Sequence, residues 1–185
     1  MRDRRVILVG GGSRSGKSAF ALAAARRMGA RRLFLATAQA GDDEMRERIS
    51  LHRRTRGDDF LTLEEPLAVP EALGRVRDVD VVVIDCLTLW LANLLLEGEE
   101  AQAVLRRVDD LAEALGRRPA HVVLVSNEVG LGLVPETALG RLFRDVAGLA
   151  HRRLAGLADE VYFGVLGVML RLKPGPVVPL TEGMP

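Results

Sequence analysis

Short, unbroken runs of apolar and β-branched residues alternate along this chain with longer segments of helical periodicity. Strands are predicted at residues 6–9, 33–36, 79–84, 121–125, 161–165 and 168–172. Most of these runs lack the polar alternation of a half-exposed strand, and four of them are followed by a helical pattern. This order predicts an α/β fold whose mainly parallel sheet is covered by helices on both faces.

Helical periodicity fills most of the segments between these strands. Helices are predicted at residues 17–28, 42–56, 89–96, 99–115 and 135–157. In the fourth of them the apolar residues recur close to a 3.6-residue period, and Gly116 predicts its end. The longest largely apolar stretch, residues 86–96, is interrupted by Thr88 and Asn93. It therefore indicates a buried helix, and the sequence predicts no membrane span.

The length of 185 residues and a hydrophobic content of 48% fit one globular domain with a sizeable core. We expect that domain to span residues 1–173, and the proline-rich residues 174–185 to form an extended tail. The apolar run at residues 6–9 is too short for a signal peptide. A single cysteine, Cys86, forms no intramolecular disulfide, so a reducing cytoplasm is the expected location.

Charge is balanced, with 26 basic and 25 acidic residues and a net charge of +1. This balance argues against nucleic-acid binding by bulk electrostatic attraction, and the low aromatic content of 4% leaves few side chains for base stacking. The basic residues are unequal in kind, because 24 are Arg and only Lys17 and Lys173 are Lys.

The sharpest local signal is a match to the phosphate-loop pattern G-x-x-x-x-G-K-[ST] between the first strand and the first helix. Its residues are Gly11, Gly12, Ser13, Arg14, Ser15, Gly16, Lys17 and Ser18. Backbone N–H groups of such a loop surround nucleotide phosphates, the lysine holds the β and γ phosphates, and the Ser18 hydroxyl would bind Mg²⁺. In a chain that uses Arg almost everywhere, Lys17 indicates that a compact ammonium is required there.

A second Mg²⁺-binding carboxylate is expected at the end of a neighbouring strand. Asp85 follows the most apolar strand and fits this role, although an aspartate before a helix can also serve as its N-cap. The loop after residues 121–125 begins with Ser126, Asn127 and Glu128 and continues with glycines. It fits an active-site loop at a strand's carboxyl end, and equally a glycine-rich connection.

His52 is the histidine of most chemical interest. It lies on one predicted helical face with Met45 and Ile49, which fits a half-buried core residue, while the arginines that follow it fit a phosphate site. A neutral imidazole beside guanidinium groups suits nucleophilic attack on phosphorus. His121 and His151 have structural interpretations, in a buried strand and a long helix.

From residue 6 to residue 165 the chain resembles the bifunctional adenosylcobinamide kinase / adenosylcobinamide-phosphate guanylyltransferase family of cobalamin biosynthesis. The resemblance rests on Gly11–Ser18, Ala36-Thr37-Ala38, Asp42-Asp43-Glu44-Met45, Arg48-Ile49, His52, Asn127-Glu128-Val129-Gly130, Val134-Pro135 and Phe143-Arg144-Asp145. It implies that ATP or GTP phosphorylates a corrinoid hydroxyl. GTP then transfers GMP to an enzyme histidine, and the phosphorylated corrinoid takes up the GMP to give adenosylcobinamide-GDP.

The same resemblance assigns individual residues. His52 aligns with the guanylylated histidine, and Lys17 belongs to the catalytic phosphate loop. Further nucleotide contacts are implied for Ala36, Thr37, Ala38, Arg53, Arg54, Thr55, Arg56, Glu64 and Asp85. The implied fold is a doubly wound P-loop (RecA-like) sheet with one antiparallel strand, assembled as a homotrimer. The family pattern has Glu more often at Asp85 and Asn at His151, so this chain departs from it at both positions.

Two other functions are compatible with the phosphate loop. The first is a P-loop kinase that phosphorylates a small hydroxyl compound without a covalent nucleotidyl intermediate. The second is a RecA-like module acting on nucleic acid, against which the charge balance and the scarcity of aromatic residues argue.

Overall fold

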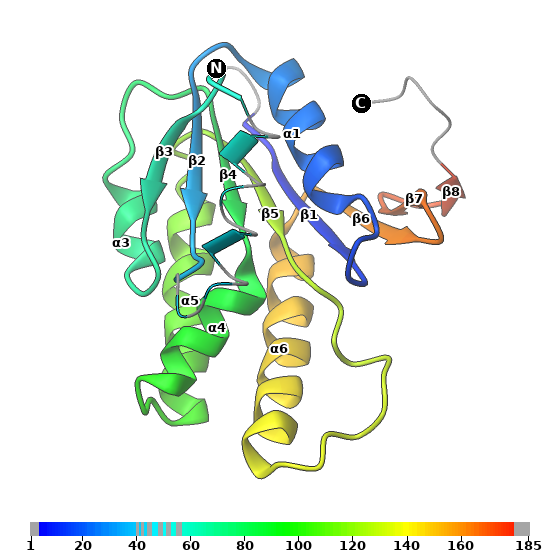
Figure 1. Cartoon of the computed structure of the whole chain (residues 1–185). Coiled ribbons are helices and arrows are strands. Elements are labelled where there is room, and N and C mark those ends of the chain that lie inside the picture. The colour runs from blue at the N-terminus through cyan, green and yellow to red at the C-terminus, as the bar shows by residue number, and fades with distance from the viewer. Residues whose placement is uncertain are drawn as a thin grey trace.

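The computed structural model describes residues 4–39, 41, 43, 46, 47, 50, 53, 54 and 57–179. Its centre is a single sheet with strand order β3-β2-β4-β5-β1-β6-β7-β8 (Figure 1). The strands are β1 (Val6–Gly11), β2 (Arg32–Ala36), β3 (Leu61–Glu64), β4 (Val81–Asp85), β5 (His121–Val125), β6 (Glu160–Val165), β7 (Val168–Lys173) and β8 (Val178–Pro179). Strands β1 to β6 are parallel, and β7 runs antiparallel to both β6 and β8.

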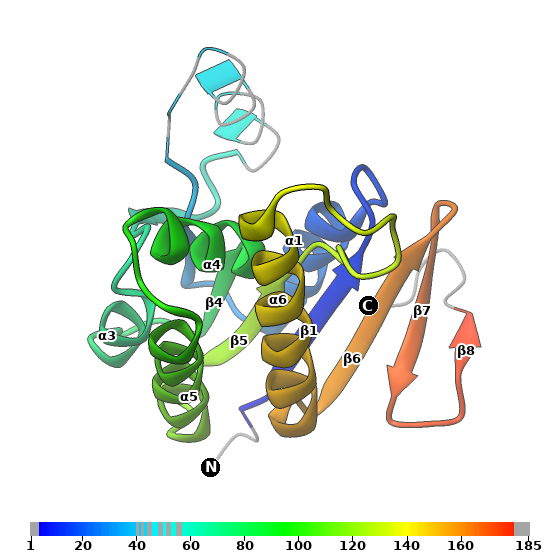
Figure 2. The same ribbon diagram turned by 90° about the horizontal axis from the view of Figure 1, so that it is seen from below.

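Helices cover both faces of this sheet. They are α1 (Lys17–Met28), α3 (Val69–Gly74), α4 (Leu87–Leu96), α5 (Ala101–Gly116) and α6 (Ala138–Leu157). Helix α1 lies on one face, and α3, α4, α5 and α6 lie on the other (Figures 1 and 2). The predicted doubly wound, mostly parallel α/β fold with one antiparallel strand is therefore confirmed.

The alternation of side chains along the strands builds two cores. In β1, Ile7 and Val9 pack with Ala21 and Leu22 of α1, whereas Val6 and Leu8 belong to the core on the other face. That second core contains the fully buried Trp90 of α4 and the apolar faces of α5 and α6. Strands buried on both sides explain why their sequences are continuous apolar runs.

Most predicted elements agree with the structure to within a few residues. The described residues of the predicted helix 42–56, namely Asp43, Arg46, Glu47, Ser50, Arg53 and Arg54, are helical. The pattern missed β3, α3 and β8. Every residue of β3 is exposed, α3 has only six residues, and β8 has two. None of these elements is long enough or buried enough to give a strong periodic signal.

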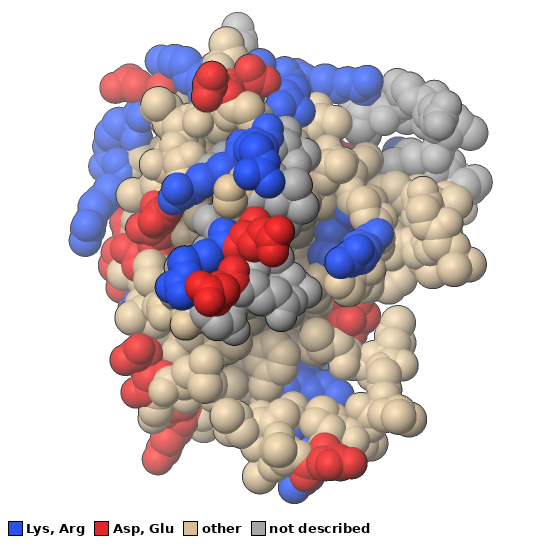
Figure 3. All heavy atoms as spheres, viewed as in Figure 1, with Lys and Arg blue, Asp and Glu red and all other residues tan. Residues whose placement is uncertain are grey.

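Charges of both signs are interspersed on the face seen in Figure 3, and its lower part carries few of them. Several arginines pair with nearby carboxylates, as Arg26 does with Asp59 at 2.9 Å and Arg31 with Asp80 at 2.8 Å. Within the part of the chain that is described, no helix combines the length and apolar character needed to cross a bilayer.

Candidate functional site

The segment between β1 and α1 has the backbone of a phosphate loop. Gly16 precedes α1 with φ of 86° and Gly11 leaves β1 with φ of 148°, conformations that favour glycine. A Cβ on Gly11 would lie 2.6 Å from the Gly164 carbonyl oxygen and 2.7 Å from Ser15 Oγ. The glycines of the motif therefore let the loop turn tightly against β6 and end at the N-terminus of α1, where anions are favoured.

Lys17 is buried within this loop, with 7% of its surface exposed. Its Nζ donates a hydrogen bond to the Gly12 carbonyl at 2.7 Å. Burial lowers the pKa of Lys17, and the nearby Asp85 carboxylate acts in the opposite direction. The Lys17 ammonium thus lies beneath the backbone of the loop. It is close to Asp85, the carboxylate that the sequence pattern predicted for the same nucleotide site.

Predicted site residues from different strands meet at the carboxyl edge of the sheet. Ala36 of β2 is in register with Glu64 of β3 and with Asp85 of β4, and Asp85 is in register with Val125 of β5. Val125 is also in register with Val9, just before the phosphate loop. Glu64, Asp85, Ser126 and the loop therefore share one edge, which is where open α/β sheets bind ligands.

The N-cap position of α4 belongs to Cys86 and not to Asp85, and the Cys86 side chain makes no capping hydrogen bond. Ser18 lies in the first turn of α1, at the position of the motif whose hydroxyl binds Mg²⁺. A hydroxyl and a carboxylate are hard oxygen donors that suit Mg²⁺, which takes much of its remaining coordination from phosphates and water. Among the described residues no cluster of three or more His, Cys, Asp or Glu forms a metal cage, and such a site does not require one.

The segment Ala36-Thr37-Ala38 is fixed mainly by Thr37. The Thr37 hydroxyl donates to the Cys86 carbonyl and accepts from the Cys86 N–H, both at 2.8 Å, and the residue is fully buried. Asn93 donates to the Thr37 carbonyl at 2.8 Å. Thr37 thus joins the ends of β2 and β4. The Thr37 N–H donates to the Asp85 carbonyl at 3.2 Å and the Ala36 carbonyl accepts from the Glu65 N–H at 2.9 Å, so Ala38 is the part of this segment left for a nucleotide.

Arg53 and Glu64 form an exposed ion pair across the same edge. Arg54 donates to the Ser50 hydroxyl at 3.0 Å. The pair brings the predicted arginine segment next to the end of β3. His52, Thr55 and Arg56 lie outside the described residues, and their roles stay predictions.

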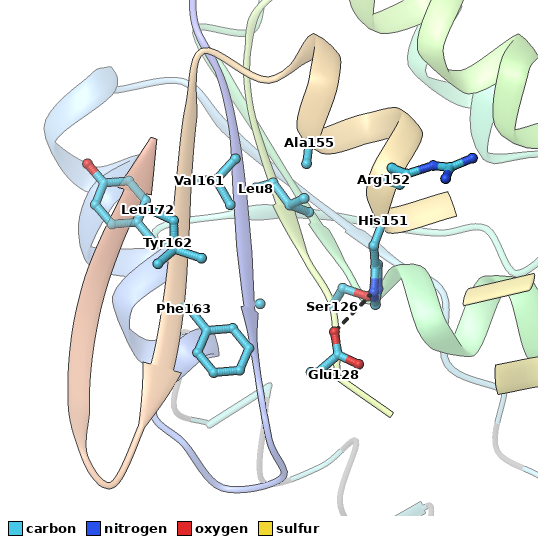
Figure 4. Close-up of a pocket in the computed structure, with 11 residues that line it drawn as sticks. Leu8, Ser126, Glu128, His151, Arg152, Ala155, Val161, Tyr162, Phe163 and Leu172 are labelled. Carbon is cyan, nitrogen blue, oxygen red and sulfur yellow. Dashed lines mark hydrogen bonds and ion pairs between the residues drawn. The ribbon is translucent and has the colours of Figure 1, made fainter. Parts of the chain in front are cut away.

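Sequence reasoning missed a cluster at the end of β5. Ser126 Oγ lies 2.6 Å from His151 Nε2, and Glu128 Oε2 lies 3.5 Å from His151 Nδ1 (Figure 4). Burial lowers the pKa of His151, although the Glu128 carboxylate acts to raise it. The loop of Ser126 and Glu128 was singled out, but nothing in the local sequence around His151 indicated that α6 would bring it there.

Residues 7–172 match the cobinamide kinase / cobinamide phosphate guanyltransferase family. The chain belongs to this family. It is 43% identical to the bifunctional adenosylcobalamin biosynthesis protein CobP of Pseudomonas aeruginosa, over 96% of this chain and 100% of the relative. It is 39% identical to the protein CobU of Escherichia coli K12, which carries the same bifunctional description, over 91% of this chain and 99% of the relative.

Solved structures add information on the fold alone. The RadB recombinase aligns with a TM-score of 0.55 at 13% identity, over 95% of this chain and 86% of its own. The flagellar accessory protein FlaH of Methanocaldococcus jannaschii aligns with a TM-score of 0.52 at 15% identity, over 95% of this chain and 84% of its own. This cobinamide kinase / guanyltransferase family member therefore has the sheet of P-loop, RecA-like ATPases.

Proposed function

We propose that this protein phosphorylates adenosylcobinamide with ATP or GTP and then transfers GMP from GTP, through a guanylylated His52, to form adenosylcobinamide-GDP. Family membership over residues 7–172 supports both activities. The observation that carries the proposal is the buried Lys17 under a phosphate loop, with Asp85 beside it at the sheet edge. That arrangement suits a nucleoside triphosphate whose phosphates are the reacting groups.

In the kinase step the loop N–H groups and Lys17 would hold the triphosphate and stabilise the charge that develops on the transferred group. Ser18 and Asp85 would hold Mg²⁺, which supplies further charge neutralisation at the phosphate oxygens when bound. Ala38, which follows the end of β2, and the pair of Arg53 with Glu64 border the same edge and would contact the rest of the nucleotide.

In the guanylyl transfer, a nitrogen of His52 would attack the α-phosphorus of GTP. A P–N bond forms, the bond from the α-phosphorus to the bridging oxygen breaks, and pyrophosphate leaves. An oxygen of the corrinoid phosphate then attacks the same phosphorus and the P–N bond breaks, which returns free histidine. Two displacements through a covalent intermediate are ordinary nucleophilic catalysis, and the neighbouring arginines suit the charge of the phosphates.

The test is labelling of the protein with GTP that carries a radioactive α-phosphate. We expect one label per chain, stable in alkali and lost in acid, as a phosphoramidate behaves. His52→Ala should remove the label. His121→Ala is the matched control, because His121 lies at the amino end of β5, at the opposite edge of the sheet, and should leave labelling intact. Label that persists in His52→Ala would refute the assignment of the nucleophile.

No labelling of the wild-type protein, together with phosphorylation of a corrinoid, would favour the simple P-loop kinase. Nucleic-acid binding is not expected, and stimulation of nucleotide hydrolysis by DNA would contradict that expectation.

We also infer a homotrimer from the family resemblance. Light scattering should then give the mass of three chains.

A further inference from the structure

Three polar side chains converge behind the phosphate loop, on the α6 face of the sheet. Ser126 directly follows β5 with 1% of its surface exposed, Glu128 lies two residues further in the loop, and His151 reaches both from α6. If His151 Nδ1 carries the proton, that N–H points at the Glu128 carboxylate and Nε2 accepts from the Ser126 hydroxyl. The His151 imidazole then holds the Glu128 carboxylate in position through its Nδ1–H.

Glu128 is held next to the phosphate loop from its other side. Its backbone N–H donates to the Gly11 carbonyl at 2.9 Å, and its Oε1 accepts from the Gly130 N–H at 2.6 Å. The preceding residue, Asn127, donates to the Thr88 hydroxyl at 3.3 Å, near the start of α4. The loop that carries Glu128 is therefore attached both to the end of β1 and to the residues that follow β4. Each oxygen of the Glu128 carboxylate has one partner among the described residues, and a carboxylate oxygen with one partner can accept a further proton.

A pocket of about 270 Å³ opens beside this carboxylate. Gly10, Val161, Phe163 and Leu172 line its apolar side, while Glu128, Ser126 and His151 form its polar end (Figure 4). A Cβ on Gly10 would approach the Phe163 ring to 3.5 Å, so the pocket borders the strand that leads into the phosphate loop. Its size and polarity fit a short aliphatic arm ending in a hydroxyl.

We propose that Glu128 is the general base of the kinase step and that His151 is the residue that positions it. The acceptor hydroxyl enters the pocket, and its oxygen attacks the γ-phosphorus held by the loop. The O–P bond forms, the bond from the γ-phosphorus to the β-phosphate oxygen breaks, and its electron pair leaves with the nucleoside diphosphate. The hydroxyl proton passes to Glu128. This inference rests on the kinase half of the proposed function.

The test separates the two half-reactions in Glu128→Gln. The amide oxygen keeps an acceptor for the Gly130 N–H, so the loop is preserved while the base is lost. We expect kcat for transfer of the γ-phosphate to adenosylcobinamide to fall about 10²-fold or more, with KM nearly unchanged. Labelling of the protein by α-labelled GTP should continue, because that reaction does not use the corrinoid hydroxyl. Glu136→Gln, the same change at another residue of the same loop, should leave both reactions unchanged.

Phosphoryl transfer by Glu128→Gln within about threefold of the wild type would overturn the inference and leave the proposed function intact. Failure of the wild type itself to phosphorylate the corrinoid would refute the kinase function and this inference with it. If Glu128→Gln takes no label because it does not fold, Glu128→Ala decides. It removes the base, so loss of phosphoryl transfer with retained labelling supports the inference, and phosphoryl transfer near the wild-type rate overturns it.

The role of His151 has its own signature. His151→Ala should lower kcat of phosphoryl transfer about tenfold without a matching rise in KM, because only the position of the base is disturbed. His151→Asn should restore much of this loss, because its side-chain N–H can replace Nδ1 as the donor to Glu128. Equal activity of His151→Ala and the wild type, or equal loss in both variants, would show that His151 does not position the base.

Discussion

Lys17 and Lys173 use the same ammonium group in two different ways. Lys17 is buried under the phosphate loop, whereas Lys173 of β7 donates to the carbonyls of Ala155 and Gly156 near the end of α6, at 3.1 and 3.0 Å. Lys173 thus satisfies free carbonyls at a helix C-terminus, where a cation is favoured. The sequence predicted a phosphate-binding role for Lys17 and not for Lys173, because only Lys17 belongs to the phosphate-loop motif.

Replacing Lys17 by Arg keeps the charge but changes its shape and hydration. The planar guanidinium does not fit a buried space that encloses a single ammonium. We expect Lys17→Arg to lower the rates of phosphorylation and of self-labelling about 10²-fold or more. Lys173→Arg is the matched control and should retain both rates. Initial rates at saturating GTP measure the effect, and normal activity of Lys17→Arg would contradict the role given to the ammonium.

The Ser126–Glu128–His151 cluster shows where residue-level prediction stops. Ser126 and His151 are 25 positions apart, and their contact depends on how α6 packs on the sheet. His151 reaches the site from the face of α6 that packs on the sheet. The pattern of apolar and polar residues around it is therefore the same as in any amphipathic helix. Such a contact is a property of tertiary packing and leaves no local signal.

At the scale of elements, the phosphate loop depends on β6 as its support. A Cβ on Gly164 would lie 3.0 Å from Ser15 Oγ and 3.1 Å from the Ser15 carbonyl oxygen. Gly164 is also in register with Gly11, so two glycines face each other where the loop leaves the sheet. The close approach of the loop to β6 therefore requires both residues to lack a side chain.

Gly164→Ala should push the phosphate loop away from β6 by a few tenths of an ångström. Overpacking of this kind costs about 1–2 kcal/mol, so we expect GTP affinity to fall about tenfold. Calorimetric titration with GTP measures it. Gly148→Ala is the control, because Gly148 is exposed in α6 and an added Cβ meets nothing within 4 Å. That control should bind GTP normally and unfold at a slightly higher temperature, and equal GTP affinity of Gly164→Ala and the wild type would contradict the support role of β6.

The elements that were predicted share long apolar runs or strong helical periods, and those that were missed do not. In β3, Leu61 and Leu63 alternate with Thr62 and Glu64, but all four are exposed at the sheet edge. In α3, Pro70 lies in the first turn of a helix of only six residues. Edge strands and very short helices are set by their neighbours more than by their own sequence, which is why periodicity did not find them.

For the whole molecule, Asp159 joins three distant segments. It accepts from the Val6 N–H at 2.7 Å and from Arg118 Nη2 at 3.0 Å, so it ties the end of α6 to β1 and to the connection before β5. The hydrogen bond from Arg118 lowers the pKa of Asp159, and burial opposes this in part. A carboxylate with a lowered folded-state pKa contributes stability above its unfolded-state pKa of about 3.9.

Asp159→Asn should therefore lower the free energy of unfolding at pH 7 by about 1 kcal/mol. As the pH falls below about 4, through the lower folded-state pKa, the wild type loses the same contribution and the difference should shrink. Urea unfolding at several pH values measures the free energy of unfolding of each protein and how the difference between them changes with pH. Asp110→Asn, at an exposed position on α5, should show no such difference. If the difference in the free energy of unfolding between wild type and Asp159→Asn grew on acidification, it would contradict the stabilising role given to the ionised Asp159.

The covalent intermediate is the central claim, and a chase of isolated labelled protein tests it most directly. The protein is labelled with α-labelled GTP, freed of nucleotide, and mixed with adenosylcobinamide phosphate alone. We predict that the label leaves the protein and appears in adenosylcobinamide-GDP without any added GTP. Label that stays on the protein, or that is released only as free GMP, would contradict the two-step transfer through His52.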